Sequence, residues 1–130
     1  APSAIIDDTV PPLELNAEIV RDPLMANGEP VVIFSASDKE SGISRAEIRE
    51  GWGVWKQVES PYQLTDRLGV LPIEVRVFDG GDNYRMVTLE GPRAYLLRYA
   101  QYAFAAVLGC IVLWIGIRLI WRTARHEHTT

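Results

Sequence analysis

The first 92 residues of the chain alternate polar and apolar positions with the period of β-strands. From Leu13 to Ile19 every second residue is apolar, and the residues between them are Glu or Asn. Side chains of a strand point to opposite faces in turn, so this pattern predicts a strand with one buried face. The segment 71–78 repeats the pattern, and Ile73, Val75 and Val77 are predicted to point inward.

Further strand-like segments follow at intervals of about ten residues, with no helical period among them. Turn residues separate them, and the segments cover residues 30–37, 43–50, 54–58, 62–64 and 84–89. The pattern predicts the all-β class, as an antiparallel β-sandwich of about seven strands. We assign the sandwich to residues 13–89. Residues 1–12 are an extended N-terminal lead-in, because Pro11 and Pro12 cannot continue a helix.

The C-terminal part has a different pattern, because Tyr99 to Ile117 are 19 consecutive residues without a charge. As a helix they cover about 28 Å, close to the roughly 30 Å thickness of the hydrocarbon layer of a bilayer. Tyrosines lie at one end of this run and Trp114 and Trp121 towards the other, as at membrane interfaces. The sequence therefore predicts one C-terminal transmembrane helix at residues 94–121. A short linker at 90–93 precedes it, and a basic tail at 122–130 follows.

The distribution of charge predicts an orientation for this helix. Residues 1–92 carry sixteen acidic and eight basic side chains, whereas residues 93–130 carry five arginines and one glutamate. Three of those arginines follow the apolar run and two precede it, which favours a cytoplasmic C-terminus. Because the first residue is Ala rather than Met, we also expect a removed signal peptide. We predict a single-pass protein of the bacterial inner (plasma) membrane, with its N-terminal domain periplasmic or extracellular.

Several short motifs occur in a fixed order along the predicted sandwich. They are Asp8-Thr9-Val10-Pro11-Pro12, Phe34 to Ile43, Glu47-Ile48, Trp55, Ser60 to Leu64, Val75 to Asp79, and Asp82-Asn83. This order resembles the immunoglobulin-like or fibronectin-III-like domains of bacterial surface proteins, over residues 8–89. The resemblance implies a sandwich with Trp55 in its core, and it says little about function. Gly80-Gly81 departs from the shorter turn that is usual in the family.

Oxygen-bearing side chains gather in two of the predicted loops: Asp38, Glu40, Asp79, Asp82 and Asn83. In such a sandwich both loops can fall at one end, and calcium takes six to eight oxygen ligands. The same residue types form Asx turns without any metal. We therefore predict no metal site and keep calcium as the alternative. For Trp52, between Gly51 and Gly53, we favour a plain structural role and keep an exposed contact for a ligand as the alternative.

The chain offers little material for catalysis. Residues 1–92 contain no His or Cys; His126 and His128 lie in the tail, and Cys110 lies within the apolar run. A His-dependent triad cannot be built in the N-terminal domain. No phosphate-binding loop is present, and the acidic N-terminal domain disfavours nucleic acid. We predict that the protein is not an enzyme, and we expect no cofactor and no nucleic-acid partner.

One face of the predicted helix carries small residues: Ala105, Gly109, Val112 and Gly116. Small side chains let a second helix approach closely in lipid. The linker of four residues reaches about 14 Å at most, so the sandwich must stay close to the bilayer. These features favour integral membrane protein partners, bound through the helix and the sandwich, in addition to the lipid.

We therefore predict a non-catalytic accessory or scaffold subunit of a larger membrane complex, whose sandwich caps the periplasmic or extracellular face. Energy-converting assemblies, such as a reaction centre with its antenna or a respiratory complex, are examples of such a complex. The alternative is a surface recognition module that binds a glycan or another protein.

Overall fold

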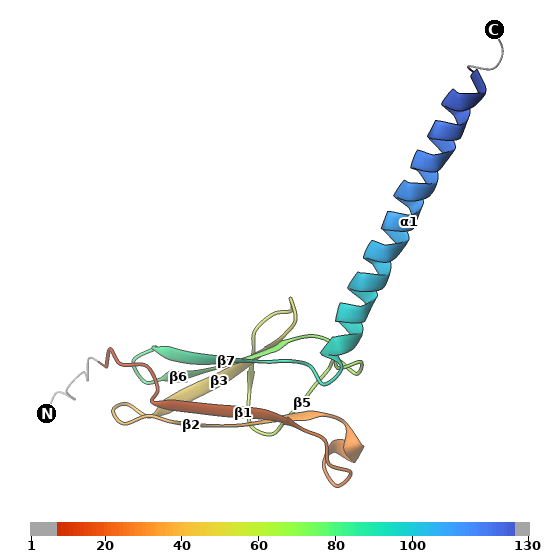
Figure 1. The fold of residues 1–130 in the computed structure, drawn as a ribbon. Helices are drawn as coiled ribbons and strands as arrows, with labels where there is room; N and C mark the ends of the chain where they lie inside the picture. The colour runs from red at the N-terminus through yellow and green to blue at the C-terminus, as the bar shows by residue number, and fades with distance from the viewer. Residues whose placement is uncertain (1–7, 127–130) are drawn as a thin grey trace, which may run out of the picture. The chain divides into compact units, whose positions relative to one another are not determined.

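The computed structural model describes residues 8–126, and Figure 1 shows its elements. The N-terminal half of the predicted lead-in (1–7) and the end of the predicted tail (127–130) lie outside the described residues. The chain divides into two compact units, one ending at Ala94 and the other beginning at Tyr95. The first unit contains all strands of the described residues, and the second is helical.

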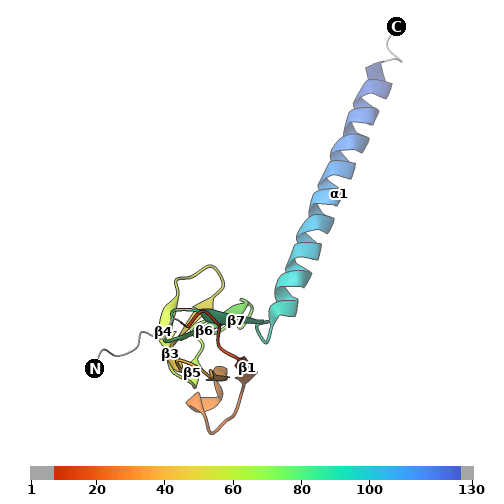
Figure 2. The same ribbon diagram turned by 90° about the vertical axis from the view of Figure 1, so that its left-hand side faces the viewer.

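The first unit consists of two antiparallel sheets that stack face to face (Figures 1 and 2). The smaller sheet has the order β1-β2-β5, with bounds Glu14–Val20, Val31–Ser37 and Tyr62–Gln63. The larger sheet has the order β4-β3-β6-β7, with bounds Lys56–Val58, Ile43–Glu50, Ile73–Asp79 and Tyr84–Leu89. A 3-10 turn, η1, covers Ala26–Gly28. The predicted antiparallel sandwich is confirmed.

The core lies between the sheets and is built from their alternating inward side chains. Its buried members come from both sheets and from the segment after β5: Val32, Ile48, Leu64, Ile73 and Val75. Ile73, Val75 and Val77 are at most 2% exposed, which confirms their predicted inward orientation. Full burial of such a side chain stabilises the fold by about 1.5–3 kcal/mol, so these residues dominate the stability of the sandwich.

Trp55 does not belong to this core, and the prediction that it does is wrong. The pairing of Ile48 with Lys56 places residue 56 on the inner face of the larger sheet. The preceding Trp55 therefore points to the outer face, because neighbouring residues of a strand point to opposite sides. There its ring lies 3.9 Å from the guanidinium carbon of Arg76 and 4.7 Å from that of Arg49. The half-buried indole is stabilised by cation–π contacts instead of core packing.

The connections between the strands gather at two ends of the sandwich. One end, which we call the acidic end, consists of residues 8–13, 38–42 and 79–83. The pairings of Glu14 with Ser37 and of Ile43 with Asp79 bring these segments together. The other end, which we call the exit end, consists of residues 21–30, 51–55, 64–72 and 90–93. The pairing of Ile73 with both Glu50 and Leu89 brings its parts together, and the chain leaves the sandwich here.

The helical element α1 runs from Ala94 to His126 and contains 33 residues. At 1.5 Å per residue it is about 50 Å long, which exceeds the thickness of a bilayer. No residue of its most apolar 18-residue window is buried within the structure. It is long and apolar enough to cross a membrane. The helix continues past Trp121 into residues that the sequence analysis assigned to the tail.

Candidate functional site

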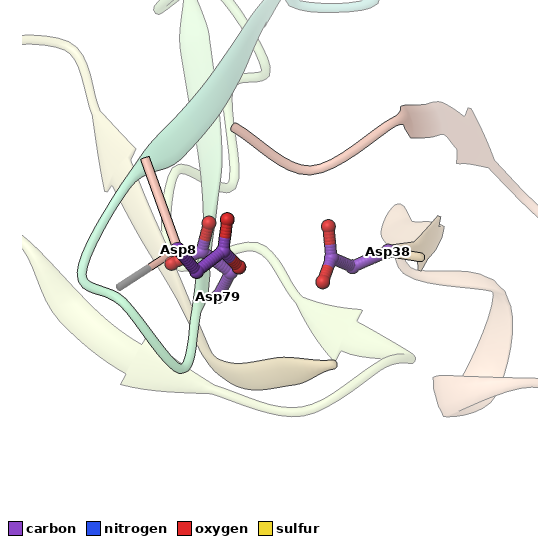
Figure 3. Close-up of side chains that lie close together, drawn as sticks. All are labelled: Asp8, Asp38 and Asp79. Carbon is purple, nitrogen blue, oxygen red and sulfur yellow. The ribbon is translucent and has the colours of Figure 1, made fainter. Parts of the chain in front are cut away.

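Three carboxylates meet at the acidic end, from segments far apart in the sequence (Figure 3). Asp8 comes from the lead-in, Asp38 from the turn after β2, and Asp79 from the last position of β6. One oxygen atom of each lies within 4.8 Å of those of the other two. Asp8 and Asp79 are only 4% and 1% exposed, so two of the three carboxylates are buried.

Asp38 organises the turn between β2 and β3. Its Oδ2 atom accepts hydrogen bonds from three successive backbone N–H groups, those of Glu40 (3.1 Å), Ser41 (2.9 Å) and Gly42 (2.9 Å). Such carboxylate-to-backbone bonds are the Asx arrangement that Asp favours in turns. The sequence has Gly at position 42 because the backbone takes a φ of 75° there, which disfavours a side chain.

Asp79 organises the second turn of this end in the same way. Its Oδ1 atom accepts hydrogen bonds from the backbone N–H groups of Gly81 (2.8 Å) and Asn83 (2.9 Å). The side-chain amide of Asn83 donates to Oδ2 of Asp79 (2.9 Å) and to the backbone oxygen of Asp8 (2.7 Å). Asp79 and Asn83 thus join the turn to the N-terminal lead-in.

Asp8 completes the cluster and changes the protonation of its neighbour Glu40. The Ser41 hydroxyl and then the Val10 N–H (3.0 Å) donate to its carboxylate, and these bonds lower the pKa of Asp8. The pKa of Glu40 is raised, first by its hydrogen bond to Asp8 and then by repulsion from the same carboxylate. Glu40 therefore takes up a proton more readily than an ordinary glutamate does, because its pKa is raised.

The structure brings together only part of the alternative calcium set. Asp38 and Asp79 lie close together, but Asp82 forms an ion pair with Arg45 (2.7 Å between Oδ1 and Nη1). The side-chain N–H₂ group of Asn83 donates hydrogen bonds to Asp8 and Asp79. Asp8 joins them instead, although the sequence analysis did not include it as a ligand. A cation at this place would be held by the three aspartates, whereas calcium takes six to eight oxygen ligands. The hydrogen bonds that these carboxylates accept indicate a turn-forming role.

Asp8 was missed because sequence alone does not show which turn the lead-in reaches. Its position directly before Thr9 and two prolines marks the segment as extended, but the partners Ser41 and Asn83 are 33 and 75 residues away. The contact depends on the stacking of the lead-in against both turns.

At the exit end, the linker is packed onto the sandwich. The N–H of Arg93 donates to the backbone oxygen of Gly69 (2.7 Å), and the N–H of Ala94 donates to that of Gly91 (3.0 Å). A Cβ atom at Gly91 would lie 2.5 Å from the oxygen of Leu71 and 2.6 Å from that of Gly69. This position therefore requires glycine, and the linker does not use the reach of an extended segment.

A second carboxylate system, which the sequence analysis missed, supports the loop beneath the linker. Glu50 accepts hydrogen bonds from the Tyr62 hydroxyl (2.9 Å) and from the N–H groups of Thr65 (3.0 Å) and Asp66 (2.7 Å). Burial acts to raise the pKa of Glu50, but the bonds from Thr65, Asp66 and Tyr62 outweigh it, and the pKa is lowered. Glu50 follows Ala46 and Ile48 on the inward face of β3. This alternation in the sequence was the one indication that the Glu50 carboxylate points inward and needs hydrogen-bond donors.

The remaining predicted residues are spread over two parts of the chain. Trp52 lies in the loop after β3 and is 88% exposed. Ala105, Gly109, Val112 and Gly116 lie on α1, and a Cβ atom at Gly109 or Gly116 would have no neighbour within 4 Å. These positions are open to a partner helix, and their role in packing stays a prediction.

Comparison with known proteins adds no family to this description. No protein-family model matches the chain, and neither the curated proteins nor the solved structures gave a match. The class of the protein is therefore defined by its own residues: an antiparallel β-sandwich followed directly by one apolar helix of membrane-spanning length.

Proposed function

We propose that the protein is a non-catalytic, single-pass accessory subunit of a larger membrane protein complex. The helix α1 anchors it in the bacterial inner membrane, and the sandwich caps the periplasmic or extracellular face of its partners. The observation that carries this proposal is the short, hydrogen-bonded linker. Arg93 is bonded to Gly69 of the sandwich, and the helix begins at the next residue.

A domain that is held this close to the bilayer is poorly placed to reach a distant ligand. Adhesive and receptor domains need a spacer to project from the surface, whereas a domain next to the membrane can contact neighbouring membrane proteins over a broad area. Residues 1–92 carry eight more acidic than basic side chains, so an anionic lipid surface would repel most of the domain. A protein neighbour is therefore the more favourable partner for its flanks.

The strand order supports assignment of the sandwich to the immunoglobulin-like type. The order β1-β2-β5 in one sheet and β3-β6-β7 in the other corresponds to strands A, B, E and C, F, G of that fold. Domains of this type commonly serve in recognition and assembly, but the fold alone does not define a function. Support for a role in assembly comes from the linker and from the helix.

The helix offers a face on which a partner helix can pack. Helices in lipid associate through van der Waals contact rather than through the hydrophobic effect, and glycines allow their backbones to approach. Ala105, Gly109 and Gly116 provide such a face, and nothing else in the described residues covers the two glycines. The same face makes a specific prediction possible.

Gly109→Leu is expected to release the protein from its complex. The leucine would separate the two helices at their closest approach and remove contacts that lipid does not replace. The measurement is extraction of membranes with a mild detergent, followed by native electrophoresis and identification of the co-purifying proteins by mass spectrometry. Ile111→Leu, on the opposite face of α1, is the matched control and should leave the complex intact. Equal recovery of partners with both variants would show that the helix is only an anchor.

A second function is favoured by one observation, the 88% exposure of Trp52. An exposed indole can stack on a sugar ring or fill a pocket of another protein, as a surface recognition module requires. The same native electrophoresis separates the two functions, because a recognition module would migrate as a small free species. Retention of the wild-type protein on an immobilised glycan, lost in Trp52→Ala, would then support recognition.

A further inference from the structure

The sandwich exposes its most accessible large apolar side chains at the exit end. Leu24, Trp52, Val54 and Leu68 are 94%, 88%, 74% and 66% exposed. At the acidic end the most exposed large apolar residue is Val10, at 53%. Folded proteins rarely leave a tryptophan almost entirely in water, so its surroundings in the membrane-anchored protein need an explanation.

One of the loops that carry these side chains is bonded to the linker, and a second is bonded to the segment that contains the first. Leu68 precedes Gly69, whose backbone oxygen accepts the hydrogen bond from Arg93. The loop with Trp52 and Val54 begins at Gly51, whose N–H donates to the oxygen of Pro72 (2.8 Å). A Cβ atom at Gly51 would also touch the side chain of Leu71 at 3.1 Å. Trp52, Val54 and Leu68 therefore lie near the point where the chain leaves the sandwich.

The length of helix between this point and the apolar run is short. The uncharged stretch begins at Tyr99, five residues after Ala94. At 1.5 Å per residue, Ala94, where the chain leaves the sandwich, is within about 8 Å of the start of the uncharged stretch along the helix. The interfacial layer of a bilayer is about 5–8 Å thick on each side, so a helix that spans the bilayer would hold Ala94 at the headgroups.

The charge of the exit end permits contact with lipid, in contrast to that of the acidic end. The connections of the exit end carry four acidic residues and three arginines, namely Asp22, Glu29, Asp66, Glu90, Arg21, Arg67 and Arg93. The acidic end carries five acidic residues and one lysine. The repulsion expected from the net charge of the domain therefore comes mainly from the end away from the linker.

We infer that the exit end is a lipid-binding surface, in which Trp52, Val54 and Leu68 insert into the headgroup region beside the transmembrane helix. Tryptophan favours this region because its ring is apolar while its N–H can bond to polar groups. Together with the linker, these loops hold the sandwich on the bilayer at several points, so that it cannot swing freely. The inference rests on the membrane anchoring in the proposed function, and it does not depend on the partner complex.

The test uses the full chain in phosphatidylcholine vesicles, which carry no net charge. The difference in emission between the wild type and Trp52→Phe isolates the contribution of Trp52. Two quenchers are compared, brominated phosphatidylcholine in the bilayer and iodide on both sides of the vesicles. The matched control is Val10→Trp on the Trp52→Phe background, which places an indole at an exposed position of the acidic end.

The inference predicts that Trp52 loses most of its emission in brominated vesicles and resists iodide, with the opposite result for the indole at position 10. Quenching of Trp52 by iodide but not by brominated lipid, while Trp114 remains quenched by the lipid, would overturn the inference and leave the anchor in place. Protection of Trp52 only in the extracted native complex would also overturn it, in favour of a protein contact. Removal of the protein by alkaline carbonate would show that the anchor is absent, which contradicts the inference and the proposed function together.

Discussion

Carboxylates hold the turns at both ends of the sandwich, but they are arranged differently at the two ends. At both ends, carboxylates accept hydrogen bonds from backbone N–H groups and thereby hold the turns. They are Asp38 and Asp79 at the acidic end, and at the exit end Asp66 together with Glu50, the last residue of β3, directly before this end. At the acidic end three carboxylates lie within 4.8 Å of one another. At the exit end Glu50 bonds to the backbone of Asp66, so the acidic groups support successive segments instead of one point.

This difference shows how local bonds and local charge can act in opposite directions. Each hydrogen bond to a carboxylate stabilises its turn, but the proximity of Asp8, Asp38 and Asp79 adds repulsion. The acidic end should therefore gain less stability from each carboxylate than the exit end does. The following predictions test that comparison.

The largest effect is expected for Glu50→Ala, which should lower the free energy of unfolding by about 2–3 kcal/mol. The substitution removes a charged acceptor and leaves the N–H groups of Thr65 and Asp66 without their partner. Asp38→Ala should cost about 1 kcal/mol or less, because the loss of turn bonds is partly offset by relief of repulsion. Urea unfolding of the full chain in mild detergent, followed by tryptophan emission, measures both values. Equal losses would contradict the proposed difference between the ends.

A smaller effect, of opposite sign, is expected for Glu40→Gln. The folded chain raises the pKa of Glu40, so it binds this proton more tightly than the unfolded chain does. The resulting stabilisation is present below the ordinary glutamate pKa of about 4.3 and is lost as the pH rises through the folded value. The neutral variant, whose amide can still donate to Asp8, should therefore be more stable than the wild type at pH 7.

The pH dependence provides the control for this variant. Thermal unfolding of both proteins at pH 7 and at about pH 4, below the ordinary glutamate pKa, should show that the advantage of Glu40→Gln disappears in acid. If the variant remained equally more stable than the wild type in acid, the charge of Glu40 would not be what destabilises the folded protein.

The smallest effect is expected from calcium, which should leave the unfolding temperature nearly unchanged at about 1 mM, a concentration at which weak extracellular calcium sites are occupied. The three aspartates provide too few ligands, and the turn N–H groups already donate to their oxygens. A native-state ligand would stabilise the fold in proportion to the logarithm of its saturation. A rise of several degrees with calcium but not with magnesium, abolished by Asp38→Asn, would establish a site.

The alternation of residues was sufficient to predict the two-layer architecture, because one buried face requires a period of two. It placed Ile73, Val75 and Val77 correctly, and the 19 uncharged residues from Tyr99 to Ile117 gave the helix. The prediction for Trp55 was wrong because the resemblance indicated an aromatic residue on this sheet but did not show on which face of the sheet it lies. The pairing of β3 with β4 decides that face, and the resemblance did not give the register of this pair.

The candidate site was less predictable than the fold for a related reason. Asp38 and Asp79 stand out in the sequence because each begins a turn, whereas Asp8 joins them only through the packing of the lead-in. Glu50 belongs to a regular strand, and only its inward position shows that its carboxylate must find hydrogen-bond donors. Residues whose partners are local could be identified, and residues whose partners come from elsewhere in the fold could not.

The outer face of the larger sheet has a consequence for how this protein can evolve. Arg76 lies over the rings of both Trp55 (3.9 Å) and Phe78 (5.1 Å), and Arg45 lies over Phe78 (3.7 Å). Glu47 forms ion pairs with both arginines. A substitution at any of these positions changes the contacts of at least one other, and Arg76 contacts three of them, so their effects on stability will not be additive. Lysine cannot replace either arginine without loss, because it lacks the planar group that stacks. Related chains should therefore show correlated substitutions at positions 45, 47, 55, 76 and 78, and this face should diverge as a set.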